Sequence, residues 1–137
     1  MLQPKRRKYR KDFRGRRKGL SFRGSTLAFG EFGIKAVEHA WMSAAQIEAI
    51  RRTVSSEMKR KGRVWLRVFP DKPVTARAAG QRMGSGKGDI DRYVFVVKPG
   101  RVIMEVAGVE ESVAREALSA ATYKLPFKAK VISKGEF

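Results

Sequence analysis

The clearest periodic pattern in the chain is an apolar stripe at helical spacing in its first half. The stripe is about 80° wide at ~100° per residue and consists of Ile47, Ile50, Val54 and Met58. Ser43 and Gln46 have capping-box spacing, with Ser at the N-cap and Gln at the third helical position. The pattern predicts a helix from Ser43 to about Lys61, with Gly62 as its C′ residue.

A second helix is predicted near the C-terminus. Gly108 breaks the preceding segment, and Glu110 and Glu111 open the helix with the charge that its dipole favours. A face suited to close packing on a sheet consists of Val113, Ala117, Ala120 and Ala121. Lys124 and Pro126 end the helix.

Short apolar or alternating runs around these helices predict strands. One or two strands are expected within residues 27–42, with 34–37 the firmest, and others at 63–69, 93–98, 102–107 and 127–132. Pro99 and Gly100 stand where a type II turn prefers them, which predicts a hairpin between the flanking strands. The element order predicts an α+β fold: a two-layer domain with two helices packed on a mainly antiparallel sheet.

The strand at 63–69 has one core face and one face of undecided role. The core face consists of Val64, Leu66 and Val68. The other face holds Arg67 between Trp65 and Phe69. Alternation alone allows this second face to pack beneath the helix or to meet a partner.

Residues 71–92, which we name the finger, are predicted to be a long flexible loop rich in Gly and Ala. Residues 82–89 resemble a phosphate-binding loop but fail its patterns. Gln81 and Gly88 break the Walker A motif, and the glycines read GxGxG rather than GxGxxG. The cations of the finger, Lys72, Arg77, Arg82 and Lys87, occur without an acid across residues 72–88. Its glycines allow close approach to a ribose-phosphate chain, although a mobile hairpin tip is the plainer alternative.

Residues 1–24, which we name the extension, carry eleven Lys and Arg and a single acid, Asp12. The segment has no helical or strand period, so we expect it to be extended or disordered alone and ordered by its partner. Tyr9, Phe13 and Phe22 lie among the cations, and both aromatic rings and guanidinium planes stack on unpaired bases. A plain solvated tail remains the alternative. The predicted organisation is therefore the extension at 1–24 and an α+β domain at 25–137 that includes the finger.

Charge changes the picture most. The chain has 31 Lys plus Arg against 13 Asp plus Glu, a formal net charge of +18. Such charge favours a polyanionic partner, either nucleic acid or an anionic membrane surface. Hydrophobic residues make up 42% of the chain, which indicates a folded core under a basic shell. Lys59, Arg60 and Lys61 are expected in the last helical turn, where they serve RNA binding or only stabilise the helix dipole.

Composition also argues against catalysis and metal binding. The chain has no Cys and one His, His39, so disulfides, thiolate metal sites and multi-histidine sites are excluded. The acids are scattered and read as solvated or salt-bridged, and no catalytic residue, cofactor or small-molecule substrate is expected. No apolar run approaches the ~18 residues that span a bilayer, and the start lacks the apolar region of a secretory signal. We therefore expect no membrane partner, and a location in the cytoplasm or the interior of an organelle.

Several strings together resemble one known family. These strings are MLQPKRRKYRKDFRGRRKG, SAAQIEAIRR, RVWLRVFPDKPVT, RMGSGKGD, VVKPGRVIMEVAGV, AREAL and KLPFKAKVI. In this order they are similar to the bacterial large-subunit ribosomal protein L-sixteen family, which is shared with eukaryotic ribosomal protein L-ten. The chain departs from the family at Trp41 and Ser85, where Arg and Lys are common.

The resemblance implies partners and sites. Members bind large-subunit (23S) rRNA near the base of the central protuberance, face the aminoacyl-site tRNA, contact neighbouring large-subunit proteins and assist late assembly. The expected rRNA-binding residues are Lys5, Arg6, Arg7, Lys8, Arg10, Lys11, Arg14, Arg16, Arg17, Lys18, Arg51, Arg52, Lys59 and Arg60. The finger residues expected near tRNA or the peptidyl transferase region are Arg77, Arg82, Met83, Gly84, Gly86 and Lys87. Arg82 matches a position that some bacterial members hydroxylate. The short start suggests a bacterial ribosome, with an organelle-encoded version as the alternative.

Two other functions remain as competitors on the residues alone. A DNA-compacting protein fits the charge equally well, although no helix-turn-helix pattern favours it. An RNA-modifying or nucleotide-hydrolysing enzyme requires a catalytic constellation that the sequence does not present.

Overall fold

The computed structural model describes residues 2–15, 18–84 and 86–134. Two helices and seven strands form in these residues. In chain order they are β1 (Phe32–Ala36), β2 (Ala40–Ser43), α1 (Ala44–Glu57), β3 (Arg63–Leu66), β4 (Lys72–Ala76), β5 (Asp89–Val97), β6 (Val102–Ala107), α2 (Glu111–Thr122) and β7 (Ala129–Ser133). The α+β class and both helices are confirmed.

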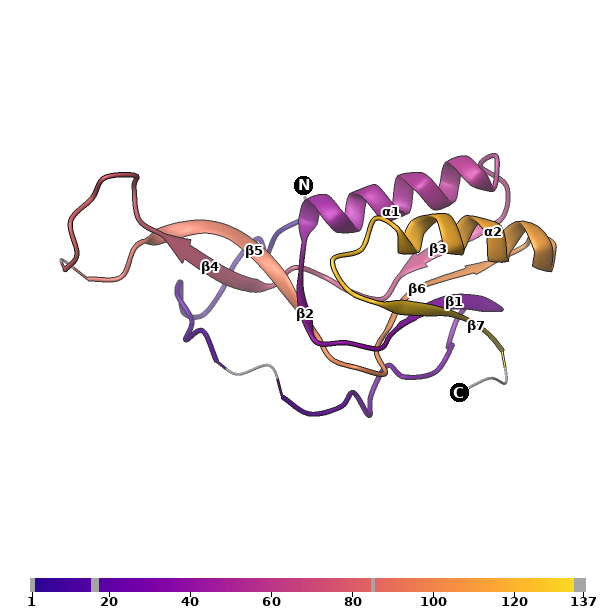
Figure 1. Ribbon diagram of the computed structural model, residues 1–137, viewed down its shortest axis with the longest axis horizontal. Coiled ribbons are helices and arrows are strands. Elements are labelled where there is room, and N and C mark those ends of the chain that lie inside the picture. The colour runs from indigo at the N-terminus through magenta and orange to yellow at the C-terminus, as the bar shows by residue number, and fades with distance from the viewer. Residues whose placement is uncertain (1, 16–17, 85, 135–137) are drawn as a thin grey trace.

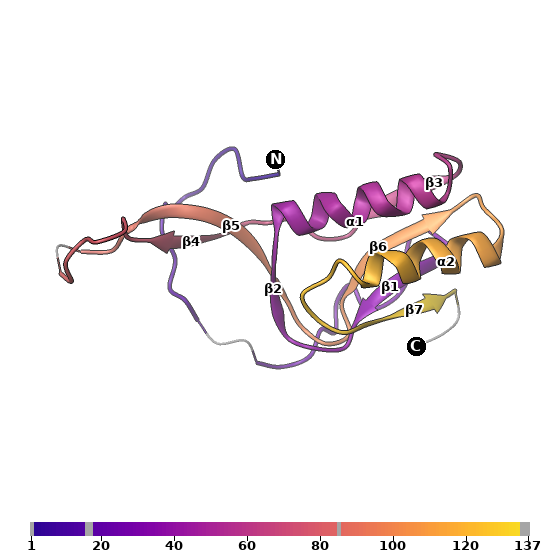
Figure 2. The same cartoon turned by 45° about the horizontal axis from the view of Figure 1, so that its top comes forward.

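The strands form two antiparallel sheets rather than the single sheet that the sequence predicted. One sheet has the order β3-β6-β1-β7, and the other has the order β2-β5-β4. Both helices lie over the same face of the four-stranded sheet (Figure 1). The three-stranded sheet carries β4 and β5 away from this body as a long arm (Figures 1 and 2).

The predicted hairpin of residues 93–98 and 102–107 is wrong, although its turn is present. Gly100 has φ +96°, and the Arg101 N–H donates to the Lys98 carbonyl over 3.2 Å, as a tight turn requires. The strands then diverge into different sheets. In one sheet β5 lies between β2 and β4, and in the other β6 lies between β3 and β1. Ala36 explains this divergence, because it exchanges hydrogen bonds with Gly100 and Arg101 and so places β1 beside the turn.

The core lies between the helices and the four-stranded sheet. The whole predicted stripe of α1 is buried, and the predicted capping box of Ser43 and Gln46 is present. In α2 the buried face consists of Ala114, Ala117, Leu118 and Ala121. Val113 and Ala120 are only half-buried, so the predicted face was partly wrong. The buried alanines let α2 pack closely against α1. The helix α1 also contacts β2 and β3.

The helix α1 ends about four residues before the predicted point. Its C-cap is Met58, and Lys59 and Arg60 adopt left-handed backbone with φ of 53° and 60°. The chain must reverse here to enter β3, and Gly62 completes the reversal with φ +75°. A Cβ at Gly62 would overlap the Ala107 carbonyl oxygen of β6. The basic residues that follow α1 therefore do not occupy its last turn, so the prediction that placed them there is wrong.

The finger is not a loop throughout. Its residues 72–76 and 89–92 belong to β4 and β5, which pair from Lys72 opposite Val94 to Ala76 opposite Asp89. Among the described residues of the finger, 71, 77–84 and 86–88 lie outside strands. Pro73 masked the first strand in the sequence, because proline is tolerated in strands chiefly at a sheet edge, and β4 is an edge strand. The paired strands hold the basic tip well away from the body (Figure 1).

The predicted strand at 63–69 ends at Leu66, and its second face is only partly covered: Trp65 and Arg67 contact other parts of the chain, whereas Phe69 is exposed. The Phe29 ring stacks on Trp65 at 6.2 Å between centroids, and the Arg67 guanidinium lies 5.2 Å from the centre of the same ring. Arg67 also forms an ion pair with Glu105, whose side chain is fully buried. The other carboxylate oxygen of Glu105 accepts N–H groups of Ala28, Phe29 and Gly30, each at 2.9 Å. This carboxylate therefore fixes the segment that leads from the extension into β1.

Candidate nucleic-acid interface

The extension follows an irregular path along the body and the finger (Figure 1). Three hydrogen bonds tie its last residues to the body. The His39 ring pairs with the Gly19 carbonyl at 2.8 Å, Ser21 N–H donates to Pro99, and Val102 N–H donates to Gly24. The described part of the extension therefore forms no helix or strand, and its root is attached to the fold.

The cations and rings of the extension face solvent. The exposed predicted residues are Lys5, Arg6, Arg7, Lys8, Arg10, Arg14 and Lys18. Lys11 is half-buried, and Arg16 and Arg17 lie outside the described residues. Phe13 and Phe22 are 91% and 86% exposed. Apolar rings this exposed are well placed to stack on unpaired bases.

The finger brings six predicted residues together near its tip. These are Arg77, Arg82, Met83, Gly84, Gly86 and Lys87, all of them exposed. The Arg77 guanidinium spans the loop, donating to the carbonyls of Gly86 at 2.8 Å and of Arg82 at 3.4 Å. It therefore braces the tip from within, a role that the sequence did not indicate.

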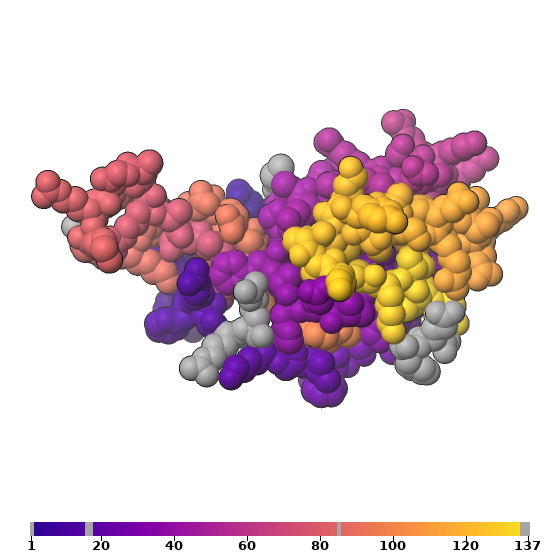
Figure 3. Space-filling view, in the orientation of Figure 1, coloured from indigo at the N-terminus to yellow at the C-terminus, as the bar shows by residue number. Residues whose placement is uncertain are grey.

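The extension and the finger are joined by lysine side chains. Lys72 Nζ donates to the Phe13 carbonyl over 2.8 Å, and Lys11 Nζ donates to the Lys87 carbonyl over 3.1 Å. The Lys87 ammonium in turn donates to the Asp12 carbonyl. Two basic segments about seventy residues apart in sequence thus form one surface (Figure 3). No sequence signal predicted this contact, because a lysine bonded to a backbone carbonyl leaves no pattern.

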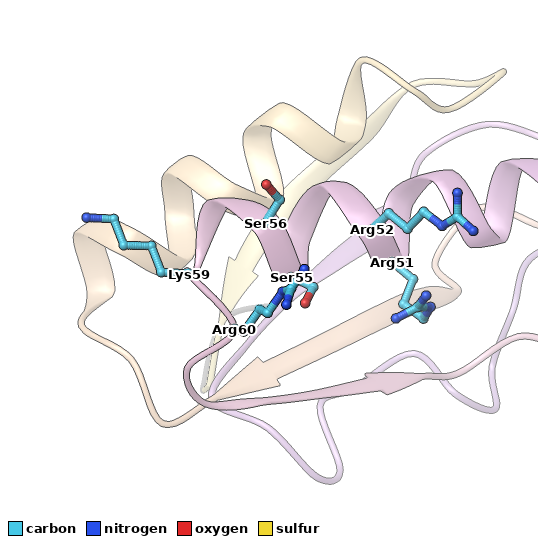
Figure 4. Close-up of a pocket in the computed structure, with 6 residues that line it drawn as sticks. All are labelled: Arg51, Arg52, Ser55, Ser56, Lys59 and Arg60. Atoms are coloured by element: carbon cyan, nitrogen blue, oxygen red, sulfur yellow. The ribbon is translucent and has the colours of Figure 1, made fainter.

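A second basic surface, the α1 cluster, lies on the outer side of α1 and just after it. Its members line a shallow groove and are Arg51, Arg52, Ser55, Ser56, Lys59 and Arg60 (Figure 4). Arg60 folds back beside Ser55, and Lys59 projects beyond the end of the helix (Figure 4). The left-handed turn at Lys59 and Arg60 brings Arg60 back toward α1, whereas Lys59 points away from Arg51 and Arg52 (Figure 4).

Glu48, which the sequence analysis did not assign to a site, organises the α1 cluster. Its carboxylate accepts from Nε of Arg51 at 3.0 Å and from Nε of Arg52 at 3.1 Å. The hydrogen bond from Arg51 is the main reason that the pKa of Glu48 falls to about 2. Glu48 therefore stays ionised at neutral pH and neutralises part of the charge that the two arginines offer to a partner.

A comparison with protein families decides the identity of the chain. Residues 4–132 match the family model described as ribosomal protein L16p/L10e. The chain belongs to this family. The resemblance seen in the sequence is thereby confirmed over nearly the whole chain.

Membership of the L16p/L10e family settles the broad role of the chain. It is a structural constituent of the large ribosomal subunit, it acts in translation, and it is not an enzyme. Its partners are rRNA and other ribosomal proteins, and its place is the ribosome. Neither helix in the described chain has the length and apolarity needed to cross a bilayer. The described residues also contain no group of three or more His, Asp or Glu arranged to hold a metal ion.

Replacing Glu48 with Gln in this L16p/L10e chain is expected to strengthen RNA binding a few-fold, because it frees Arg51 and Arg52 to meet phosphates. The measurement is the dissociation constant for a large-subunit rRNA fragment at fixed salt. Glu111→Gln is the matched control, since Glu111 likewise pairs with an arginine one turn away, Arg115, but lies on α2. Unchanged affinity of the Glu48 variant would show that the α1 cluster does not face RNA.

Proposed function

We propose that this chain binds large-subunit rRNA near the base of the central protuberance through the extension, the α1 cluster and the finger. The observation that carries the proposal is the joined surface of extension and finger. Its lysines and arginines neutralise phosphates and release condensed counterions, which supplies most of the binding free energy. The folded body fixes where each basic segment enters the RNA.

The distribution of acids supports this orientation. Glu110, Glu111 and Glu116 are all exposed and lie at the N-cap and in the first half of α2, where Glu111 pairs with Arg115. Exposed carboxylates repel phosphates, so we expect this end of α2 to face away from rRNA. We propose that this pole is turned toward solvent or toward neighbouring ribosomal proteins.

We further propose that the finger helps to organise the aminoacyl-tRNA site, contacts tRNA there, and that the chain supports late subunit assembly. The two-stranded arm projects a basic tip beyond the body (Figure 2). Met83 is 97% exposed at this tip. Arg82, beside it, is exposed as well and is therefore accessible to the hydroxylation that the family resemblance suggests.

A site-specific photocrosslinker at position 83 tests the proposal. Large subunits carrying the variant are purified through a salt wash, joined with small subunits and loaded with aminoacyl-site tRNA. We expect crosslinks from position 83 to tRNA or 23S rRNA. The matched control is a crosslinker at Tyr123, which is also highly exposed, at 88%, but lies at the end of α2.

Two results would count against the proposed function. Loss of the chain from large subunits in the salt wash would argue against stable rRNA binding. Equal crosslinking to tRNA from positions 83 and 123 would argue against a specific role for the finger.

A further inference from the structure

A small cavity lies where the extension crosses the three-stranded sheet, and we name it the junction pocket. Its volume is about 210 Å³. The lining residues used below are Asp12 and Arg14 of the extension, Trp41 of β2, and Lys72 and Lys87 of the finger. Sites for drug-sized ligands occupy roughly 300–1,000 Å³, so this pocket suits a smaller group such as one base or one phosphate.

One side of the pocket offers a ring. Trp41 stands opposite Val96 in β5, and Lys72 stands opposite Val94. Because Val94 and Val96 are two residues apart on one strand, Trp41 and Lys72 share a face of the sheet. The Lys72 ammonium accordingly lies 6.0 Å from the centre of the Trp41 ring. An aromatic ring beside cations is the usual platform for an unpaired base.

The lining of the pocket also contains three cationic residues, Arg14, Lys72 and Lys87. Two of them are held in place by the extension, since Lys72 donates to the Phe13 carbonyl and Lys87 to the Asp12 carbonyl. An ammonium group has three donors, so each lysine keeps N–H groups for a further acceptor. The result is a pair of ammonium groups positioned before any ligand arrives.

Asp12, the one acidic residue in the lining, does not repel a bound anion strongly, because its charge is neutralised. The Asp12 carboxylate is paired with the Arg7 guanidinium at 2.9 Å. The pocket therefore keeps a positive balance beside an aromatic surface. Phosphate alone would not stack on the ring, and an apolar ligand would not pair with the cations. A nucleotide of single-stranded RNA uses both.

We propose that the junction pocket binds one unpaired ribonucleotide of rRNA, with its base on Trp41 and its phosphate between Arg14, Lys72 and Lys87. This inference rests on the proposed function, because the bound rRNA supplies the nucleotide. It adds a base-binding pocket to a surface on which only the exposed rings of the extension, such as Phe13 and Phe22, were so far expected to stack on bases.

The two tryptophans of the chain allow a direct test. In a Trp65→Phe variant all tryptophan fluorescence comes from Trp41. In a Trp41→Phe variant all of it comes from Trp65. Each variant, checked for native circular dichroism, is titrated with a pyrimidine hexaribonucleotide and with an abasic ribose-phosphate hexamer of equal charge. We expect the base-bearing hexamer to quench Trp41 strongly, the abasic hexamer to quench it weakly, and Trp65 to respond to neither.

Two further variants refine the test. Lys72→Gln in the Trp65→Phe background is expected to reduce the quenching of Trp41. Trp41→Leu is expected to weaken hexamer binding by roughly tenfold, the effect typical of losing one base stack. The corresponding change at the other tryptophan, Trp65→Leu, is the control and should leave hexamer affinity unchanged if the variant remains folded.

The outcomes separate this inference from the proposed function. Equal quenching of Trp41 by both hexamers would overturn the base site and leave only a phosphate site. An unresponsive Trp41 in a protein that still binds an rRNA fragment would overturn the junction pocket while the proposed function stands. Failure to bind the rRNA fragment at all would overturn both.

Discussion

Replacing Glu105 with Ala is expected to lower the free energy of unfolding by about 3–5 kcal/mol, the usual cost of removing one partner of a buried ion pair. The substitution removes the charge partner of Arg67 and leaves the N–H groups of residues 28–30 without their acceptor. Chemical denaturation followed by circular dichroism measures the effect. Glu111→Ala is the matched control, because its pair with Arg115 is exposed and exposed pairs contribute only about 0–1 kcal/mol.

The same carboxylate predicts a pH dependence. Burial raises the pKa of Glu105, but hydrogen bonds from Gly30, Arg67, Phe29 and Ala28 outweigh it and hold the pKa below its ordinary value of 4.5. The unfolded chain therefore binds this proton more readily than the folded chain. The contribution of Glu105 is full above the ordinary pKa and is lost as pH falls through the lower folded value. Equal acid sensitivity of the parent chain and Glu105→Gln would contradict this assignment.

Deleting residues 2–18 is expected to weaken binding to an rRNA fragment by at least about 100-fold at low salt, because ten of the eleven cations of the extension are removed. The deletion spares the ties at Gly19, Ser21 and Gly24 and the contacts of Glu105, so the domain should stay folded. The plot of log K against log salt should become shallower by about 0.7–0.9 for each phosphate that the shortened chain no longer neutralises.

A full-length variant separates charge from chain length. In it, every Lys and Arg of residues 5–18 is replaced by Gln. If phosphate neutralisation drives binding, this variant should match the deletion in both affinity and salt slope. A salt slope equal to that of the parent chain, in either variant, would show that the extension does not contact phosphates.

Local pattern predicted the helices well and strand pairing poorly. The burial of Ile47, Ile50 and Val54 and the cap at Ser43 follow from spacing within one helix. The separation of β5 and β6 into different sheets depends on Ala36, more than sixty residues away from their turn, so no local window contains it. The early end of α1 likewise depends on the approach of Gly62 to β6.

The candidate site was likewise predictable from the sequence only in its local features. Charge density in the extension and the glycine-rich tip of the finger identified two basic segments, but nothing in either segment indicated that they touch. Glu105 does leave a signal in the sequence, because it is the only charged residue in the apolar run 102–107. A lone carboxylate inside a buried strand requires a cation or N–H donors nearby. The division of the chain at residue 24 stays a prediction.

The attachment of the extension to the finger has a consequence for sequence variation. Two of its three bonds end on main-chain oxygens of Asp12 and Phe13, which every amino acid possesses. Substitutions at these two positions therefore leave the two bonds intact, and a change at Asp12 also removes its ion pair with Arg7. Substitution of Lys72 or Lys87 would remove the bonds, since their ammonium groups are the donors. Among homologues we expect wide divergence at 12 and 13 alongside retained lysines at 72 and 87.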